Sequence, residues 1–173
     1  MEITDLVNAC KEGSASAQQE LYLRYADAMF NTCLRIVGNR QDAEDLLQVA
    51  FTKVFLKIKT FRGESTIGAW IKKIVVNLSL NHVKRNRVFF EEVSDLEDMP
   101  EEPFIEDHLL SVEKIKGAMN LLPDGYRLVF SLYLLEGYDH SEIASILKIS
   151  EATSKSQYSR AKRKIKELLK VEG

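Results

Sequence analysis

The chain is poor in residues that cross-link or interrupt a protein. Its 173 residues include two cysteines, three prolines and eight glycines. Two cysteines are too few for a disulfide framework, and Cys10 and Cys33 each lie in a helical pattern where a small buried side chain would fit. Because strong helix formers dominate outside residues 88–107, we predict an all-α protein.

Long apolar runs and a secretory signal are also lacking. No apolar run approaches the roughly 20 residues that a membrane-spanning helix needs, and residues 1–5 lack a basic and then apolar pattern. The three histidines, His82, His108 and His140, are scattered and show neither metal-ligand spacing nor a nucleophile–base pattern. We therefore expect a cytoplasmic protein without direct membrane insertion, metal, other cofactor, small-molecule substrate or catalytic activity.

Positive charge is missing from one stretch, residues 88–107, which contains nine acidic side chains and no basic one. Residues 65–87 carry five Lys or Arg and no acid, and residues 148–170 carry eight Lys or Arg against two acids. The formal net charge is −2, so the chain without those nine acids carries +7. Two cationic surfaces joined by an anionic tether indicate a protein that holds nucleic acid at two places. On charge alone, two solvated helix faces and a disordered linker explain the pattern equally well.

The acidic string is also the predicted domain boundary. It has no sustained helical period, contains two of the three prolines, and has too much like charge to pack tightly. We predict two small helical domains, residues 1–87 and 108–173, joined by a flexible acidic linker at 88–107.

Apolar residues at helical spacing predict three helices in the first domain. The first would end at a left-handed cap at Gly38-Asn39, the second would start near Asp42 with a capping box, and Ser65 would cap the third. Their predicted buried stripes are Leu21, Tyr25, Ala28, Thr32 and Ile36; Ala43, Leu47, Phe51, Val54 and Ile58; and Ile67, Ile71, Ile74 and Leu78.

The end of the chain has the layout of a helix-turn-helix, preceded by predicted helices at 111–121 and from Pro123 to about Leu135. Asp139 and Glu142 would open a short helix, and Ser150 would cap the long final one after a turn. The final helix has an inner stripe of Ser154, Tyr158, Ala161, Ile165 and Leu168 and an opposite face of Lys155, Ser156, Ser159, Arg160, Arg163 and Lys166. Cations and short hydroxyls suit a helix that reads the major groove, whereas a plain helical hairpin with a solvated basic face is the alternative.

Two aromatic rings, an amide and a cation lie around one predicted loop–helix junction, which includes Phe61, Gly63, Ser65, Trp70, Lys73 and Asn77. Bases of a single strand could stack on the rings while lysines follow the phosphates. Asn77 lies one helical turn after Lys73, so both could face the same bound base. Phe61 and Trp70 could instead be core residues, although a core aromatic can also form the wall of a pocket.

At this point the chain resembles the extracytoplasmic-function group of bacterial sigma factors. The matching motifs keep their order and spacing from about residue 5 to residue 169. They are residues 42–48 (DAEDLLQ), 61–65 (FRGES), 70–77 (WIKKIVVN), 122–123 (LP), and 141–144 (SEIA) with the final helix. The resemblance implies promoter-specific transcription initiation, with core RNA polymerase and promoter DNA as partners and an anti-sigma factor as a further partner.

The resemblance also implies a role for each surface. Glu44, Asp45 and Gln48 would bind the polymerase clamp, where acids suit a basic coiled coil. The loop–helix junction would capture a flipped base of the −10 element, with stacking offsetting a flipping cost of about a few kcal/mol. The −35 duplex would be read through Thr153, Lys155, Ser156, Ser159, Arg160 and Arg163. The acidic linker would then pass through the positively charged interior of the polymerase.

Three residues depart from the usual pattern of that family. Ser154 and Gln157 stand where an apolar residue and an arginine are common, so we expect weaker packing at the first and lower surface charge at the second. Gly68 near the start of the third helix costs about 1 kcal/mol relative to Ala. These departures leave the −35 sequence preference open. An autonomous helix-turn-helix repressor or activator, which would bind duplex tightly without polymerase, is the alternative function.

Overall fold

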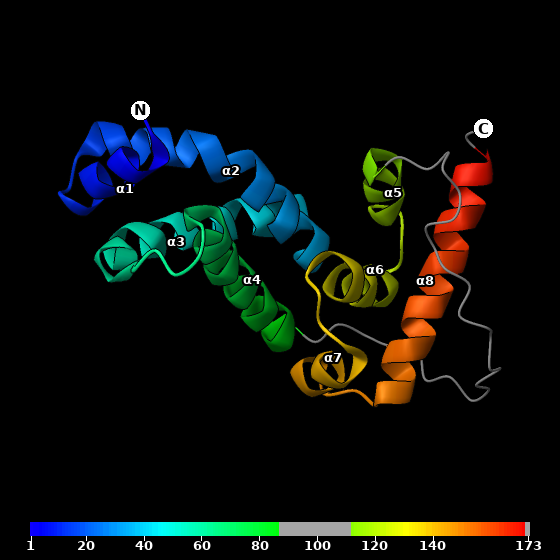
Figure 1. Ribbon diagram of the computed structural model, residues 1–173. Helices are drawn as coiled ribbons and strands as arrows, with labels where there is room; N and C mark the ends of the chain where they lie inside the picture. Colours follow the sequence, from blue (N-terminus) through cyan, green and yellow to red (C-terminus); the bar gives the residue numbers. More distant parts are fainter. Residues whose placement is uncertain (87–111, 172–173) are drawn as a thin grey trace. The chain divides into compact units, whose positions relative to one another are not determined.

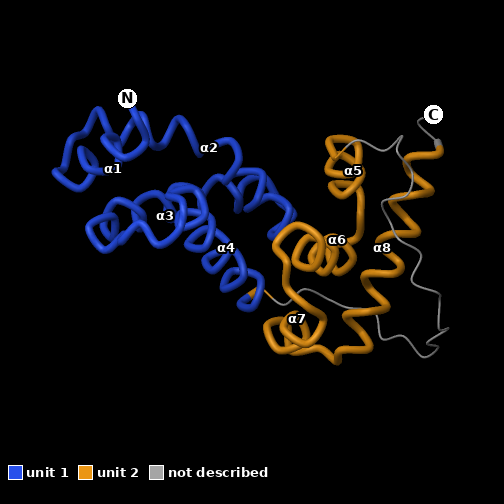
Figure 2. The backbone as a smooth tube through the Cα atoms, viewed as in Figure 1, with its two compact units in different colours: residues 1–85 blue, residues 86–173 orange. Residues whose placement is uncertain are grey.

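The computed structural model describes residues 1–86 and 112–171, and all the regular elements within them are helical (Figure 1). The chain divides into two compact units, Met1–Arg85 and Asn86–Gly173 (Figure 2). The prediction of an all-α protein built from two helical parts is confirmed. The predicted acidic linker at 88–107 lies outside the described residues.

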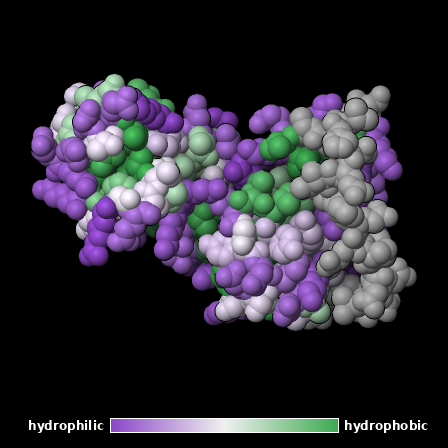
Figure 3. Space-filling view, viewed as in Figure 1, coloured by the Kyte–Doolittle hydropathy of each residue, from purple (hydrophilic) through white to green (hydrophobic). Residues whose placement is uncertain are grey.

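Within those same ranges, none of the helices combines the length and the apolar composition that crossing a bilayer requires. Some large apolar side chains are nevertheless exposed, among them Leu23 and Leu56 in unit 1 and Val112 and Leu121 in unit 2. The face in Figure 3 shows hydrophilic residues around smaller apolar patches on each unit. The surface therefore offers apolar contacts as well as charge.

Unit 1 consists of α1 (Ile3–Lys11), α2 (Ala15–Val37), α3 (Arg40–Lys57), the single 3₁₀ turn η1 (Ile58–Thr60) and α4 (Ile67–Asn86). The long helix α2 packs against both α1 and α3, and η1 packs against α1 and α3. All four α-helices contribute to one apolar core, in which Leu6, Leu21, Val54 and Ile71 are fully buried. This core fixes where the loop between η1 and α4 begins and ends.

The helix boundaries of unit 1 follow from local capping. Gly38 ends α2 in the predicted left-handed conformation, with φ 79°. The next residue, Asn39, caps α3, because its side-chain oxygen accepts a hydrogen bond of 3.0 Å from the backbone N–H of Asp42. Helix α3 therefore starts two residues before Asp42, and the capping box predicted at Asp42 and Asp45 is replaced by the Asn39 cap. Likewise Thr66, not Ser65, caps α4, by accepting a bond of 3.2 Å from the N–H of Ala69.

The buried stripe predicted for α3 is confirmed in full, whereas those of α2 and α4 are confirmed only in part. Ala28 of α2 is exposed. Ile74 and Leu78 of α4 lie half-buried at the edge of the core, while Val75 and Leu80 are buried. Since α4 is apolar on more than one side, its periodicity alone did not decide which side faces the core.

Gly68 has a packing reason. A Cβ atom at this position would lie 2.9 Å from Cε1 of Tyr25, closer than carbon atoms pack. The missing side chain therefore lets the start of α4 approach the Tyr25 ring on α2. The glycine that departs from the family pattern allows a close helix–helix contact, and that contact places the first turn of α4.

Unit 2 contains α5 (Val112–Met119), α6 (Asp124–Phe130), η2 (Ser131–Leu135), α7 (His140–Leu147) and α8 (Glu151–Val171). Helix α6 begins directly after Pro123, one residue later than predicted. The turn η2 continues α6 as a π-helix, in which the N–H of Glu136 donates to the carbonyl of Ser131 over 3.1 Å. Helix α8 packs against α5, α6 and α7.

The predicted helix-turn-helix is formed by α7 and α8. Asp139 and Glu142 make the predicted capping box, with bonds of 2.7 Å and 2.8 Å between each side chain and the backbone N–H of the other. Lys148 ends α7 in the left-handed region, with φ 55°. Ser150 then accepts a bond of 3.0 Å from the N–H of Thr153 and so caps α8. The turn chemistry predicted from the sequence is confirmed.

Candidate nucleic-acid interface

The loop between η1 and α4, residues 61–66, is held at both ends. At its start, the N–H of Phe61 donates to the carbonyl of Ile58 over 3.1 Å. At its end, Thr66 caps α4 with its side chain and accepts from the N–H of Trp70 over 3.1 Å. Between these anchors residues 62–65 are exposed, and Gly63 has a φ of 74°. The loop is a short exposed bridge between two fixed points.

One face of α4 continues from this loop. Trp70, Lys73 and Asn77 follow at spacings of three and four residues, so they lie on the same side of the helix. The Trp70 ring packs against Phe61 at a centroid distance of 5.5 Å and an angle of 54°. Lys73 and Asn77 are exposed, whereas both rings are half-buried against the core. Phe61 and Trp70 are therefore packing residues that also present ring surface at the loop.

The residues predicted to bind polymerase lie on the solvent side of α3. Glu44, Asp45 and Gln48 are exposed, and Glu44 pairs with the guanidinium of Arg40 at 3.0 Å. Sequence reasoning missed a neighbour: Val49, one turn past Asp45, is a large apolar side chain that is 53% exposed. Its lack of fit to the buried stripe of α3 was the available signal. The face thus combines acids with apolar surface.

The six residues predicted to read the −35 duplex lie on α8 with unequal exposure. Lys155 and Arg163 are exposed, and the other four are half-buried. The side chains of Thr153 and Ser156 already make hydrogen bonds within the first turns of the helix. The Ser156 hydroxyl donates to the carbonyl of Thr153 over 2.9 Å, and Thr153 shares a hydrogen bond of 2.8 Å with Ser150. The side chains that reach furthest into solvent are therefore cations.

Ser154 and Gln157 point inward, which confirms the predicted inner position of Ser154 and contradicts the expectation that Gln157 contributes to the charge of the surface. Ser154 is fully buried, and its hydroxyl shares a hydrogen bond of 2.8 Å with Nδ1 of His140 on α7. Gln157 is 1% exposed, so it does not face a duplex and does not change the charge of that surface. A partner across the helix-turn-helix satisfies the polar group, so this position is not weakly packed.

Aromatic rings that pack on one another join η2, α7 and α8. The Tyr133 ring of η2 stacks on His140 at 4.4 Å and 13°, and lies 4.5 Å from the Tyr158 ring of α8. Lys162 places its ammonium 4.8 Å from the centroid of Tyr158. These contacts, together with the bond to Ser154, set the angle between α7 and α8.

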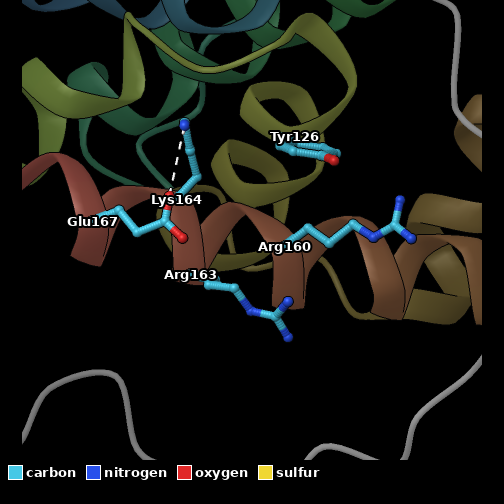
Figure 4. Close-up of a pocket in the computed structure, with 5 residues that line it drawn as sticks. All are labelled: Tyr126, Arg160, Arg163, Lys164 and Glu167. Atoms are coloured by element: carbon cyan, nitrogen blue, oxygen red, sulfur yellow. Dashed lines mark ion pairs between the residues drawn. The ribbon is translucent and has the colours of Figure 1, made fainter.

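A shallow pocket of about 220 Å³ lies beside the cationic face of α8 (Figure 4). It is lined by Tyr126 of α6 and by Arg160, Arg163, Lys164 and Glu167 of α8. Figure 4 shows Lys164 directed toward its ion-pair partner Glu167, 3.6 Å away, while the two arginines extend from the helix in other directions. Sequence reasoning missed Tyr126 and Lys164, because only the fold brings α6 alongside α8. An anion such as a phosphate suits this lining.

The two cysteines are buried in unit 1. Burial raises the pKa of the Cys33 thiol above its usual value, and burial followed by the charge of Glu20 raises the pKa of Cys10. Both therefore remain neutral thiols at pH 7, as small core residues do.

Comparison with known families decides what these surfaces belong to. Residues 21–88 match the family described as Sigma-70 region 2, and residues 113–165 match Sigma-70, region 4. All the predicted −10 and polymerase-binding residues fall in the first match, and all the predicted −35 residues fall in the second. The chain belongs to the extracytoplasmic-function sigma factors. It is a promoter-specific transcription initiation factor, and an autonomous repressor or activator is not favoured.

Relatives match this sigma factor over almost its whole length. The RNA polymerase sigma-H factor of Pseudomonas aeruginosa is 28% identical, over 95% of this chain and 92% of the relative. The ECF RNA polymerase sigma factor SigW of Bacillus subtilis is 26% identical, over 98% of each chain. The solved structure of CnrH in complex with the cytosolic domain of CnrY has a TM-score of 0.51 at 20% identity and covers 99% of both chains. That structure supports the fold alone.

Proposed function

We propose that unit 1 of this sigma factor binds core RNA polymerase and captures a base of the melted −10 element, and that unit 2 reads the −35 duplex. The observation that carries the proposal is the loop at 61–66, pinned at both ends beside a face of α4 that presents Trp70, Lys73 and Asn77. A pinned loop beside a ring, a cation and an amide has the groups that a flipped base needs.

Each of these groups would make a different kind of contact with the captured nucleotide. The exposed part of the Phe61–Trp70 pair offers ring surface for stacking, which contributes about 1–3 kcal/mol per base. Gly63 and Ser65 lie in the exposed part of the loop, where backbone and hydroxyl groups can approach a base closely. Lys73 would contact the adjacent phosphate, and Asn77 would bond to the edge of the base.

Polymerase binding is proposed for the exposed side of α3. Glu44 and Asp45 carry the charge that a basic partner recognises, and Gln48 adds an amide on the same side of the helix. The exposed Val49 would supply apolar area between them. Steering by the acids and burial of the apolar side chain would act together.

The −35 duplex is proposed to receive the N-terminal half of α8. Lys155, Arg160 and Arg163 would neutralise phosphates or bind guanine edges, and the hydroxyls of Thr153, Ser156 and Ser159 would make the shorter contacts. Because Ser154 and Gln157 face inward, base reading falls to the outward residues between and around them.

Further proposals concern the setting in which these surfaces act. The family resemblance supports an anti-sigma factor as a partner that covers one or both units. We also propose that the protein acts in the cytoplasm, where it would meet the polymerase and promoters, and that it contributes binding and no catalysis. The acidic residues at 88–107 are proposed to lie against the positively charged interior of the polymerase.

The test of base capture is run-off transcription with purified core polymerase and the Asn77→Ala variant. We expect normal binding to core but impaired opening of a duplex promoter, because only the contact to the flipped base is removed. Asn8→Ala, the same change at an exposed position of α1, is the matched control. Core binding that falls as much as opening would show that Asn77 does not belong to a base pocket.

A gel shift with and without core polymerase separates a sigma factor from an autonomous regulator. The protein alone should bind a promoter duplex weakly in a gel shift, and core polymerase should be required for specific binding. Tight specific binding of the isolated protein, with no promoter-dependent product in the presence of core, would contradict the proposed role.

A further inference from the structure

Lys11, the last residue of α1, reaches across unit 1 to the loop at 61–66. Its ammonium donates a hydrogen bond of 2.8 Å to the backbone carbonyl of Phe61, fifty residues away in the sequence. The same ammonium lies 5.7 Å from the centroid of the Phe61 ring. Lys11 is half-buried in this position, and so the bond is shielded from bulk water.

The carbonyl that Lys11 holds is the last fixed point before the exposed part of the loop. The N–H of Phe61 is already bound to Ile58, so the two bonds together fix both peptide groups of Phe61. Residues 62–65 that follow have one left-handed position, at Gly63, and are exposed. Rotation of the peptide after Phe61 would therefore move the exposed segment that follows it, and the Lys11 ammonium also contacts the Phe61 ring, which packs against Trp70.

A role in the core or a direct contact with DNA explains these observations less well. The ammonium of Lys11 is directed at a carbonyl and a ring within unit 1. To contact a phosphate of DNA, it would have to give up both of these contacts. Lys11 also precedes the residues that match Sigma-70 region 2, which begin at 21, so the match assigns it nothing. The bond connects the end of α1 to the first residue of the loop.

We propose that Lys11 is a positioning residue for base capture: it holds the Phe61 peptide and ring in the orientation that the −10 base requires. The inference rests on the proposed function of the loop. It assigns to α1 a part in promoter opening that is separate from binding polymerase or the −35 duplex.

Lys11→Met and Lys11→Arg test the inference in holoenzyme, with a promoter that carries 2-aminopurine in the non-template strand of the −10 element. Met keeps an unbranched apolar side chain that is one atom shorter and has no donor, and Arg keeps both donor and charge. We expect Lys11→Met to slow opening about tenfold, the factor corresponding to the loss of one charge-assisted hydrogen bond, and Lys11→Arg to recover most of that loss. Lys59→Met is the control, since Lys59 is an exposed lysine of η1 next to the same loop.

A second measurement uses Trp70, the single tryptophan of the chain. In the full-length protein without polymerase, Lys11→Met should shift the Trp70 emission to longer wavelength and increase its quenching by acrylamide, and Lys11→Arg should not. Binding to core and protection of the −35 element should stay within twofold of the unsubstituted protein.

Several outcomes would overturn the inference. They are unchanged opening with Lys11→Met, an equal loss with Lys59→Met, no recovery with Lys11→Arg, or a parallel loss of core binding. Asn77→Ala, measured alongside, separates this inference from the proposal it rests on. If Asn77→Ala impairs opening and Lys11→Met does not, only the role of Lys11 is wrong. If Asn77→Ala leaves opening intact, the proposed base pocket itself is wrong.

Discussion

Gly68→Ala is the substitution for which the structure and simple helix propensity predict opposite results. Gly68 lies in the first turn of α4, where replacing Gly by Ala ordinarily stabilises an exposed helix by about 1 kcal/mol. The new methyl group, however, would lie 2.9 Å from Cε1 of Tyr25 and 3.6 Å from Cζ. Carbon atoms pack best at about 3.5–4.0 Å, so the ring or the helix must move by roughly half an ångström.

The magnitude follows from the competition between the two effects. Overpacking in a well-packed region costs about 1–3 kcal/mol, which exceeds or cancels the gain in helix propensity. We therefore expect Gly68→Ala to destabilise unit 1 by up to about 2 kcal/mol. In a Tyr25→Ala background the obstructing ring is gone, so the same substitution should stabilise unit 1 by close to the intrinsic 1 kcal/mol.

Urea unfolding of all four members of this double-mutant cycle provides the assay. Fluorescence of Trp70 reports on unit 1 specifically, because it is the only tryptophan and lies two residues from the substitution. The expected interaction energy between positions 25 and 68 is about 1–3 kcal/mol. If Gly68→Ala stabilises both backgrounds equally, the close approach of α4 to the Tyr25 ring does not limit this position.

Three further predictions concern the −35 surface, the helix-turn-helix and the core. Replacing Lys155 and Arg160 with Ala should reduce the salt dependence of −35 duplex binding by holoenzyme, by about 0.9 in the log–log slope for each lost phosphate contact. Ser154→Ala should destabilise unit 2 by about 1–3 kcal/mol in thermal unfolding, because it removes a buried hydrogen bond between α8 and α7. Burial raises the pKa of Cys33, so unfolding stability should be level near pH 7 and fall as pH rises through the usual thiol range and up to the raised value.

Each of these predictions has a contradicting result. An unchanged salt slope after both substitutions would remove those residues from the phosphate-binding surface. Ser156→Ala is the matched control for Ser154→Ala, since Ser156 lies on the outward side of the same helix; equal losses of stability would mean that burial of Ser154 is unimportant. Cys33→Ala should make the alkaline fall of stability shallower, and an identical pH profile would show that this thiol does not titrate between the folded and unfolded states.

Local signals in the sequence predicted local structure well. Gly38 as a left-handed cap, the capping box at Asp139 and Glu142, and Ser150 as the start of the last helix all depend on groups within four residues of one another. Where two residues within one turn could each cap a helix, the wrong one was predicted. Asn39 caps α3 although acids follow it, because its extended backbone places the amide oxygen at the free N–H of the first turn.

The features that were not predicted from the sequence depend on contacts between residues that are distant along the chain. Ser154 was expected to weaken packing because its partner, His140, belongs to another helix. The buried stripe predicted for α4 was confirmed only in part, because apolar residues cover more than one side of this helix and packing in the common core decides between them. The family motifs, in contrast, depend on residue identities along the chain, and so fold class and function could be recognised without these contacts.

The contacts that sequence reasoning missed converge on the place where the proposed chemistry occurs. Lys11 fixes the beginning of the loop at 61–66, Thr66 fixes its end, and the approach of Tyr25 to Gly68 places the turn of helix that follows. Ordering a side chain on binding costs about 0.5–1.5 kcal/mol, and flipping a base costs a few kcal/mol more. Because three contacts already hold this loop, little further ordering is needed when the base binds. The stacking energy can then offset the cost of flipping the base. This predicts that loosening any one of the three contacts slows promoter opening more than it weakens binding to polymerase.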